Sequence, residues 1–192
     1  RHNCRLFVPS SIAAFGKDTP LEGTPQLTYQ RPGTIYGITK VAGELLCDYY
    51  VARFRLDVRG LRYPGLISAS APAGGGTTDY AVDIFRQAIR YRHYSCFLRP
   101  DTRLDMMYMP DAIEALLALM DAPADSLTSP VYNVSAFSPS ALELADLVRR
   151  AFPGERITFA SDRRRQTIVD SWPEDVDDAR ARRDWGFRPA YD

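Results

Sequence analysis

The sequence predicts an α/β protein in which helices cover a parallel sheet. An apolar run at residues 5–9 ends in small polar residues, as expected for a parallel strand that is covered on both faces. Residues 36–54 have helical character without an internal proline, and a second strand follows at 56–65. Strand, long helix and strand in this order favour a right-handed crossover between two parallel strands.

Later segments continue the alternation of helices and strands. Residues 79–92 resemble a helix whose free amides Thr77 or Thr78 can cap. Residues 110–121 have the spacing of an amphipathic helix with one buried face. The side chains expected on that face are Ile113, Leu116, Leu117 and Met120.

The last third of the chain predicts two short strands at 131–134 and 156–160. The helix between them is expected to start at Ser138, a capping residue that is followed by proline. A final helix should stop at Gly186. Further upstream, the side chains of Met106, Met107 and Tyr108 are expected to form strand core rather than to bind a ligand.

Composition excludes several classes of function. The 24 basic and 24 acidic residues cancel, so a nucleic-acid or membrane-surface role gains no support. The three cysteines form no CxxC pair and no cluster with metal-ligand spacing, so no metal site and a reducing, cytoplasmic setting are expected. No apolar run approaches the roughly 18 residues of a membrane span. A soluble protein of ordinary globular composition is expected.

The sequence YGITK places Tyr36 and Lys40 four residues apart, on one face of the predicted helix. An ammonium one turn away stabilises a phenolate and so favours tyrosine as a general base. Ser10 and Ser11 stand where the preceding strand ends, which is the edge at which α/β sheets bind ligands. Because 11 tyrosines and two lysines produce about 0.1 such pairs by chance, this context carries more weight than the spacing.

Three segments, FVPSSIAAFG, YGITKVAGE and LRYPG, resemble the extended short-chain dehydrogenase/reductases over the whole chain. The resemblance implies a Rossmann-like parallel sheet with a small α/β substrate-binding lobe, and NAD as cofactor. It implies Ser11, Tyr36 and Lys40 as catalytic residues, with Tyr36 and Lys40 also contacting the cofactor. The strand end that would pack against the nicotinamide comprises Tyr63, Pro64, Gly65 and Leu66.

Within this family the chain is most similar to the short-chain L-threonine 3-dehydrogenases. The strings that carry this likeness are QRPGTIYGITK, AGGGTTDYAVDIF, RLDMMYMPD, YNVSAFS and RQTIVDSWP. The resemblance implies oxidation of the threonine 3-hydroxyl to 2-amino-3-oxobutanoate. The residues it nominates for substrate binding are Ser10, Ser11, Tyr36, Gly75, Thr77 and Trp172. Glycines there would let backbone amides approach the substrate carboxylate.

The chain departs from the family in lacking the glycine-rich turn that opens a dinucleotide-binding sheet. We therefore expect it to be a C-terminal portion of a longer enzyme that binds NAD poorly alone. Residues 1–70 would then belong to the Rossmann domain and carry the catalytic residues. Residues 71–192 would form mainly the substrate-binding lobe, with a segment at about 105–135 that returns to the Rossmann part.

The expected partners are a small-molecule substrate, L-threonine, and a second copy in a homodimer or a missing N-terminal half. Neither nucleic acid nor a membrane is expected. The expected location is cytoplasmic, or mitochondrial in a eukaryote. Two other functions remain open. One is a nucleotide-sugar epimerase or dehydratase, which shares Ser11, Tyr36 and Lys40, and the other is a non-catalytic binding or assembly module.

Overall fold

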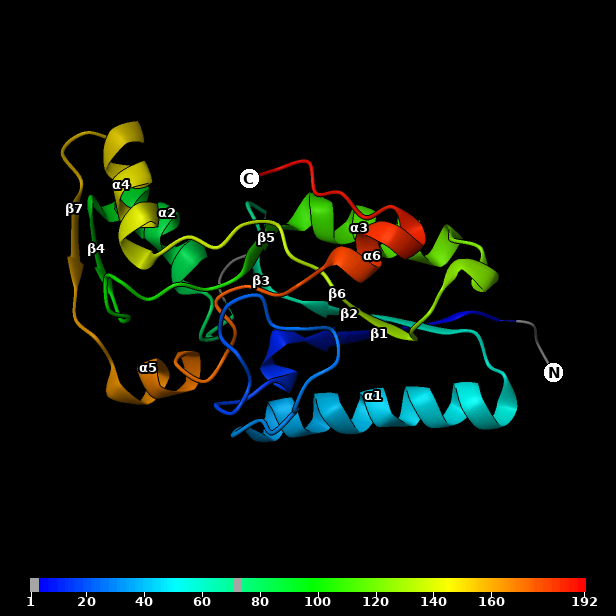
Figure 1. Ribbon diagram of the computed structural model, residues 1–192. Coiled ribbons are helices and arrows are strands. Elements are labelled where there is room, and N and C mark those ends of the chain that lie inside the picture. The colour runs from blue at the N-terminus through cyan, green and yellow to red at the C-terminus, as the bar shows by residue number, and fades with distance from the viewer. Residues whose placement is uncertain (1–3, 71–73) are drawn as a thin grey trace.

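The computed structural model describes residues 4–70 and 74–192 (Figure 1). Residues 71–73, where the second predicted domain begins, lie outside the described part. A three-stranded sheet has the order β1-β2-β6, and both of its strand pairs are parallel. Its strands are β1 (Leu6–Ser11), β2 (Val58–Tyr63) and β6 (Val131–Asn133). The predicted α/β class with parallel strands is confirmed.

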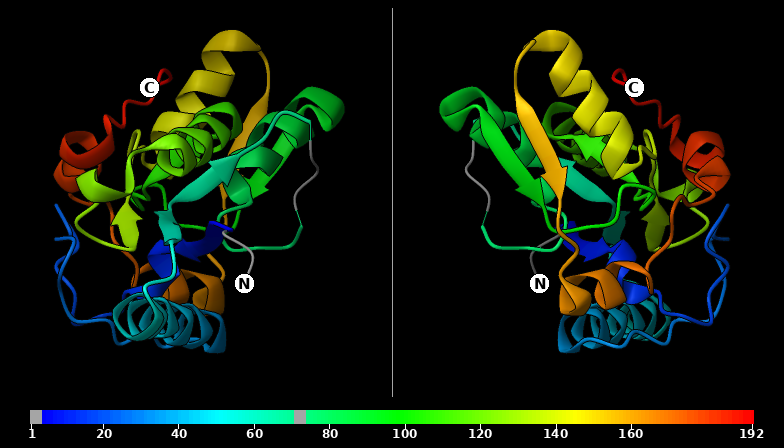
Figure 2. Two further views of the ribbon diagram at one scale, coloured as in Figure 1. Left: turned by 90° about the vertical axis from the view of Figure 1, so that its right-hand side faces the viewer. Right: turned by 90° about the vertical axis from the view of Figure 1, so that its left-hand side faces the viewer.

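Helices cover both faces of this sheet. Helix α1 (Ile35–Phe54) connects β1 to β2 and lies along one face (Figure 1). Helices α3 (Met109–Asp121) and α6 (Ala179–Trp185) lie on the other face (Figure 2). The expectation that the first strand is covered on both faces is wrong at its start, where Leu6 is 54% exposed. The reason is that β1 is the edge strand of the described sheet.

Two smaller parallel sheets complete the described strands. Strand β3 (Gly65–Ile67) pairs with β5 (Met106–Tyr108), and β4 (His93–Cys96) pairs with β7 (Arg156–Phe159). The remaining elements are α2 (Tyr80–Tyr91), α4 (Ala141–Ala151), α5 (Arg163–Val169) and the 3-10 turns η1 (Ile12–Ala14) and η2 (Ala124–Ser126). Helices α2 and α4 stand beside the β4–β7 pair, at one end of the molecule (Figures 1 and 2).

The buried apolar side chains form two large clusters. One joins α2 and α4 to the β4–β7 pair and includes Tyr80, Ile84 and Leu144. The other lies between the three-stranded sheet and the helices α3 and α6, and includes Leu61 and Leu119. Met106 and Met107 are both fully buried, which confirms their expected place in strand core. The division into domains at residue 70 stays a prediction.

Two predicted helix starts are wrong. Helix α2 begins after Asp79 rather than after Thr77 or Thr78. Helix α4 begins after Ser140 rather than Ser138, because the Ser140 hydroxyl and the Glu143 carboxylate satisfy each other's backbone amides in a capping box. The end of the last helix is confirmed, since the residue after α6, Gly186, adopts the left-handed conformation.

The buried face predicted for α3 is wrong at two of its four positions, while Leu116 and Met120 are half-buried. Ile113 is 51% exposed and Leu117 is 48% exposed, whereas Ala112, Ala115 and Leu119 are buried. Alanine has a small side chain, so this face lets the helix axis come closer to the sheet than the isoleucine and leucine face would. None of the described helices is both long and apolar enough to cross a membrane.

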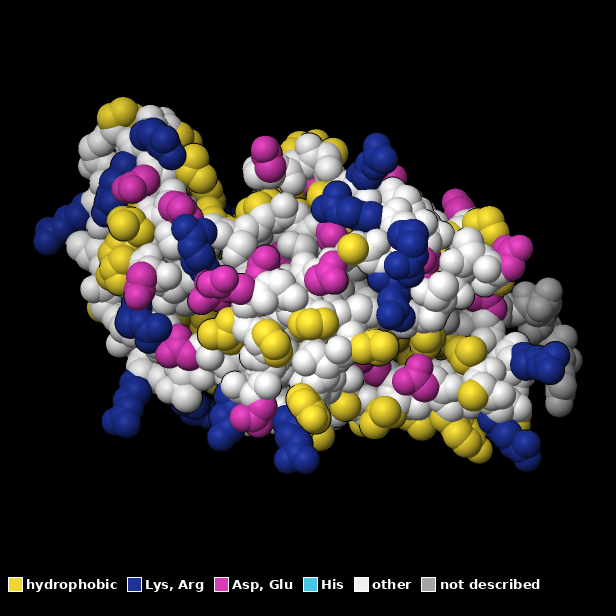
Figure 3. Space-filling view, viewed as in Figure 1, with side chains coloured by type: hydrophobic (Ala, Val, Ile, Leu, Met, Phe, Trp, Pro, Cys, Tyr) yellow, Lys and Arg dark blue, Asp and Glu magenta, His cyan; other side chains and the backbone are white. Residues whose placement is uncertain are grey.

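Helix α1 exposes many apolar side chains on its outer face. Figure 3 shows apolar side chains gathered along the edge of the molecule where α1 runs. The exposed members near its end are Leu45, Leu46, Tyr49, Tyr50 and Phe54. Its inner face is different, because it buries Glu44 and Cys47 beside the sheet and Gly37 against the turn η1.

Candidate active site

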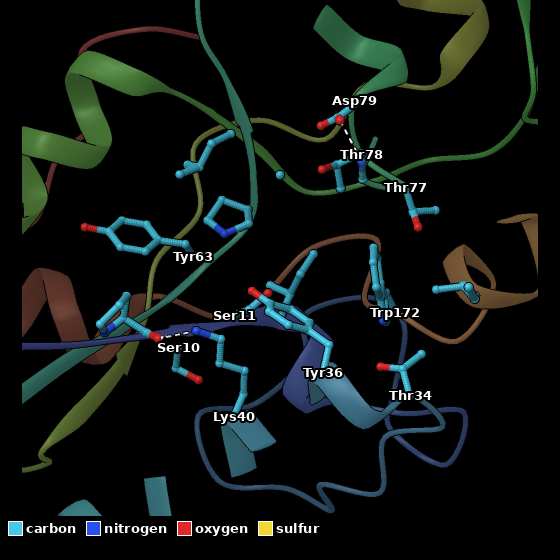
Figure 4. Close-up of a pocket in the computed structure, with 17 residues that line it drawn as sticks. Ser10, Ser11, Thr34, Tyr36, Lys40, Tyr63, Thr77, Thr78, Asp79 and Trp172 are labelled. Atoms are coloured by element: carbon cyan, nitrogen blue, oxygen red, sulfur yellow. Dashed lines mark hydrogen bonds between the residues drawn. The ribbon is translucent and has the colours of Figure 1, made fainter. Parts of the chain in front are cut away.

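A cavity of about 670 Å³ opens at the carboxyl ends of β1 and β2 (Figure 4). This is the edge where parallel α/β sheets bind ligands. Nearly all the residues nominated from the sequence line it. They are Ser10, Ser11, Tyr36, Lys40, Tyr63, Pro64, Gly65, Leu66, Thr77 and Trp172. Gly75 does not line the cavity, whereas its neighbour Gly76 does.

Helix α1 starts directly beside the end of β1. Thr34 caps the helix, because its hydroxyl accepts a hydrogen bond of 3.1 Å from the amide of Gly37. A Cβ atom on Gly37 would lie 2.1 Å from the carbonyl oxygen of Ala13. Only glycine therefore allows this close approach, which brings Tyr36 to the cavity.

Lys40 holds its ammonium next to the Tyr36 ring. Its Nζ donates a hydrogen bond of 2.7 Å to the carbonyl oxygen of Pro9 in β1. The same nitrogen lies 5.2 Å from the centroid of the Tyr36 ring, within the range of a cation–π contact. Figure 4 shows Tyr36 and Lys40 rising from α1 toward the strand that carries Ser11. The four-residue spacing thus places both groups at one cavity.

The two tyrosines of the cavity differ in how their hydroxyls are used. The Tyr63 hydroxyl donates to the carbonyl oxygen of Ala112 at 2.8 Å, and burial raises the pKa of Tyr63 to about 12. This phenol stays protonated near neutral pH and cannot act as a base. Tyr36 is 51% exposed. Of the two, only Tyr36 combines access to the cavity with a neighbouring ammonium.

The two serines at the end of β1 also differ. Ser11 caps the turn η1, where its oxygen accepts a bond of 3.2 Å from the amide of Ala13. Its O–H can therefore still donate to a ligand. Ser10 is buried, and its hydroxyl donates to the carboxylate of Glu44 in α1. Ser10 can offer a ligand only a lone pair.

The opposite wall of the cavity comes from residues 76–79 and from the segment around Trp172 (Figure 4). The Asp79 carboxylate accepts hydrogen bonds of 2.6 Å from the amides of both Gly75 and Gly76. These amides were expected to approach a substrate carboxylate. They are already occupied by Asp79, so the structure gives them a local partner.

Sequence reasoning missed several residues of the cavity. Thr34 and Asp79 had a signal, because each is a polar residue directly before a helix. Ile168 had none, since the short helix α5 that carries it was not predicted. Gly65 was nominated from the sequence, and the structure shows why this position is a glycine. A Cβ atom there would lie 2.4 Å from the sulfur of Met106 and 3.2 Å from Thr78.

Comparison with known proteins places this geometry in a family. Residues 1–135 match the family described as the NAD dependent epimerase/dehydratase family. The chain belongs to this family. Family members carry out NAD-dependent chemistry, so the expectation of an NAD-dependent enzyme is met at the level of the family.

The similar proteins include L-threonine dehydrogenases. The chain is 51% identical over 191 residues to the mitochondrial L-threonine 3-dehydrogenase of Bos taurus, covering 100% of this chain and 51% of that protein. It superposes on the GalE-like L-threonine dehydrogenase of Cupriavidus necator in its apo form with a TM-score of 0.95 and 51% identity, covering 98% of this chain and 68% of that one. For the L-threonine dehydrogenase of Phytophthora infestans the TM-score is 0.96 and the identity 45%, with 98% and 61% covered.

These comparisons confirm the family, the predicted resemblance and the Rossmann-like α/β class. The chain spans about half the length of the mammalian relative that it matches. The activities of these relatives are therefore properties of proteins longer than this chain.

Proposed function

We propose that the chain carries the catalytic and substrate-binding residues of an NAD-dependent L-threonine 3-dehydrogenase. The observation that carries this proposal is the Lys40 ammonium, held between the Tyr36 ring and the end of the strand that bears Ser11. The similarity to L-threonine dehydrogenases of known structure supports the choice of substrate.

In the proposed reaction, Ser11 donates a hydrogen bond to the substrate 3-hydroxyl oxygen and orients it. Tyr36, as the phenolate, removes the hydroxyl proton. Lys40 stabilises that phenolate by its positive charge. Bound NAD would supply the acceptor for the hydride from C3, so that the hydroxyl becomes the carbonyl of 2-amino-3-oxobutanoate.

The residues present fit the nicotinamide end of the cofactor. Tyr63, Pro64, Gly65 and Leu66 form one continuous wall of the cavity, beside Lys40. This wall is apolar apart from its backbone, and the Tyr63 hydroxyl points away to Ala112. A flat ring can pack there while Lys40 donates to ribose hydroxyls. Thr77 and Trp172 would contact the substrate from the opposite wall.

The test is threonine-dependent formation of NADH, followed by absorbance. It is measured for the chain alone and for the chain joined to the part of the Cupriavidus necator dehydrogenase that it does not span. We expect activity from the joined protein that disappears when threonine is omitted. A joined protein that melts cooperatively and binds NAD but leaves threonine unchanged would refute the proposal.

An epimerase or dehydratase acting on nucleotide sugars is the second candidate, because the matched family is named for these activities. The same preparation distinguishes the two. A UDP-sugar that raises the melting temperature, where threonine does not, would favour the second candidate.

A further inference from the structure

A buried ion pair lies beneath the cavity, between α1 and β2. Glu44 is 4% exposed and Arg62 is 6% exposed. The Arg62 Nη2 atom lies 2.7 Å from Oε2 of Glu44, and Nε lies 3.0 Å from Oε1. The guanidinium therefore contacts both carboxylate oxygens, which is the strongest arrangement for such a pair.

Further contacts hold both partners in place. Arg62 also donates to the carbonyl oxygen of Gln26 at 2.8 Å and to Oδ1 of Asn133 at 3.0 Å. Glu44 also accepts from the Ser10 hydroxyl and, at 2.7 Å, from the Gln30 amide. The pair and its contacts thus tie α1 to all three strands of the β1-β2-β6 sheet and to the loop before the helix.

Lys40 and Glu44 stand four residues apart on α1. On an isolated helix this spacing brings lysine and glutamate together as an ion pair. In this structure Lys40 instead donates to the carbonyl oxygen of Pro9 and lies over the Tyr36 ring. The carboxylate is bound by Arg62, whose rigid fork satisfies both oxygens at once.

We propose that Arg62 is a positioning residue that occupies the Glu44 carboxylate and thereby keeps the Lys40 ammonium at the cavity beside Tyr36. Without Arg62, the buried Glu44 charge would need another cation, and Lys40 is one helical turn away. The use of the Lys40 ammonium in catalysis rests on the proposed function. The competition of Arg62 and Lys40 for the Glu44 carboxylate does not depend on the proposed function.

Other charges near the pair are consistent with this balance. Asp48, one turn beyond Glu44, has its pKa raised by burial and by the Glu44 charge, while the Arg62 charge lowers it. Across the cavity, Asp79 is bound by two backbone amides. The carboxylates on α1 itself are Glu44 and Asp48, and Glu44 is the nearer of the two to Lys40 along the helix.

The chain contains only two lysines, Lys17 and Lys40, and this permits a direct test. Each variant is acetylated with limiting acetic anhydride at pH 8, and the ratio of Lys40 to Lys17 modification is read by peptide mass spectrometry. In Arg62→Gln the Lys40 amine should pair with the Glu44 carboxylate and so react more slowly with the anhydride. The ratio should fall about three-fold.

Arg59→Gln is the matched control. Arg59 is also buried in β2, but it donates to the carbonyl oxygens of Leu119 and Ala122 at the end of α3, away from the cavity. It should lower the melting temperature without changing the labelling ratio. A purely structural role for Arg62 predicts looser packing and a higher ratio, the opposite sign.

Two more variants close the test. Arg62→Gln combined with Glu44→Gln should restore the native ratio, because the fall requires the carboxylate. Arg62→Lys should recover most of the native ratio. An unchanged or raised ratio in Arg62→Gln overturns the proposal. The proposal is also overturned if Arg62→Gln no longer melts cooperatively but Arg59→Gln still does. Lys40 has then failed to replace the missing cation.

These measurements need neither cofactor nor substrate. A chain that fails to oxidise threonine yet shows the expected labelling pattern would refute the proposed function alone. An active protein with an unchanged ratio would refute the positioning role alone.

Discussion

The two walls of the cavity are built in different ways. The lower wall, from β1, α1 and β2, carries Ser11, Tyr36 and Lys40 on regular elements that a buried ion pair and a close helix contact hold together. The upper wall, residues 76–79 and the segment around Trp172, consists of loops and helix ends with partly exposed contacts. Reacting groups that must approach to hydrogen-bond distance are held more accurately by rigid helices and strands than by loops.

The two walls would therefore have different roles in the reaction. The lower wall would hold the reacting groups in one geometry, while the upper wall would select the substrate. Changes to the lower wall should therefore affect the rate and the stability strongly, and changes to the upper wall should do so weakly.

The largest effect is expected from Tyr36→Phe. The variant keeps the ring under the Lys40 ammonium but lacks the group that takes the proton, so the rate of threonine oxidation should fall about 100- to 10,000-fold. Tyr63→Phe is the control for loss of a tyrosine hydroxyl that points away from the cavity, and Trp172→Phe probes the upper wall. Each should cost less than about ten-fold. The comparison fails if Trp172→Phe lowers kcat as much as Tyr36→Phe, measured in the joined protein.

A glycine in each wall offers a test of packing. Gly37→Ala places a methyl group against the Ala13 carbonyl, so α1 must shift, and unfolding should require about 1–3 kcal/mol less free energy despite the better helix propensity of alanine. In Gly76→Ala the methyl group meets only the Asp79 carboxylate, at 3.3 Å, and the change should stay within about 0.5 kcal/mol. Urea unfolding measures both. Equal losses would show that the two walls are equally tight.

Asp105, directly before β5, should make the stability of the protein depend on pH. It is fully buried, accepts a hydrogen bond of 2.8 Å from Ser135, and burial raises its pKa well above the ordinary value. Above about pH 4 the unfolded chain ionises this group while the folded chain keeps its proton. Its contribution to stability therefore falls as pH rises, by about 1.4 kcal/mol per unit until the folded pKa is reached.

Asp105→Asn removes this dependence, because the amide does not titrate. The difference in unfolding free energy between variant and parent should move in favour of the variant from pH 5 to pH 7. Urea unfolding at three pH values measures it, and parallel curves would contradict the buried-acid assignment.

A modest loss of stability is expected from Asp79→Ala in the upper wall. It removes the acceptor for two partly exposed backbone amides, so a loss of about 1 kcal/mol is expected. Asp79→Asn keeps one acceptor oxygen and should lose less. Thermal melting of both variants measures this, and a loss above about 3 kcal/mol would place Asp79 among the rigid supports.

Local patterns predicted the lower wall well, for a physical reason. A four-residue spacing on a helix brings Tyr36 and Lys40 to one face whatever the rest of the chain does. A strand that ends in serine brings Ser11 to the ligand-binding edge of a parallel sheet. The catalytic roles of these residues stay predictions, although the structure brings all three to one cavity.

Patterns failed where packing decided between similar choices. The apolar spacing in α3 favoured Ile113 and Leu117, yet the sheet accepts the alanine face. Helix α5 begins with three arginines and was not predicted, so the cavity contact of Ile168 was missed.

Short-range order along the chain is enough to predict the parallel α/β class, the family resemblance and the face shared by Tyr36 and Lys40. The cation that neutralises Glu44 depends instead on how distant segments pack. Arg62 is distant in sequence from Lys40, and the pairing of β2 with β1 brings it to the Glu44 carboxylate. The distance between Arg62 and Glu44 in space cannot be read from a pattern along the chain.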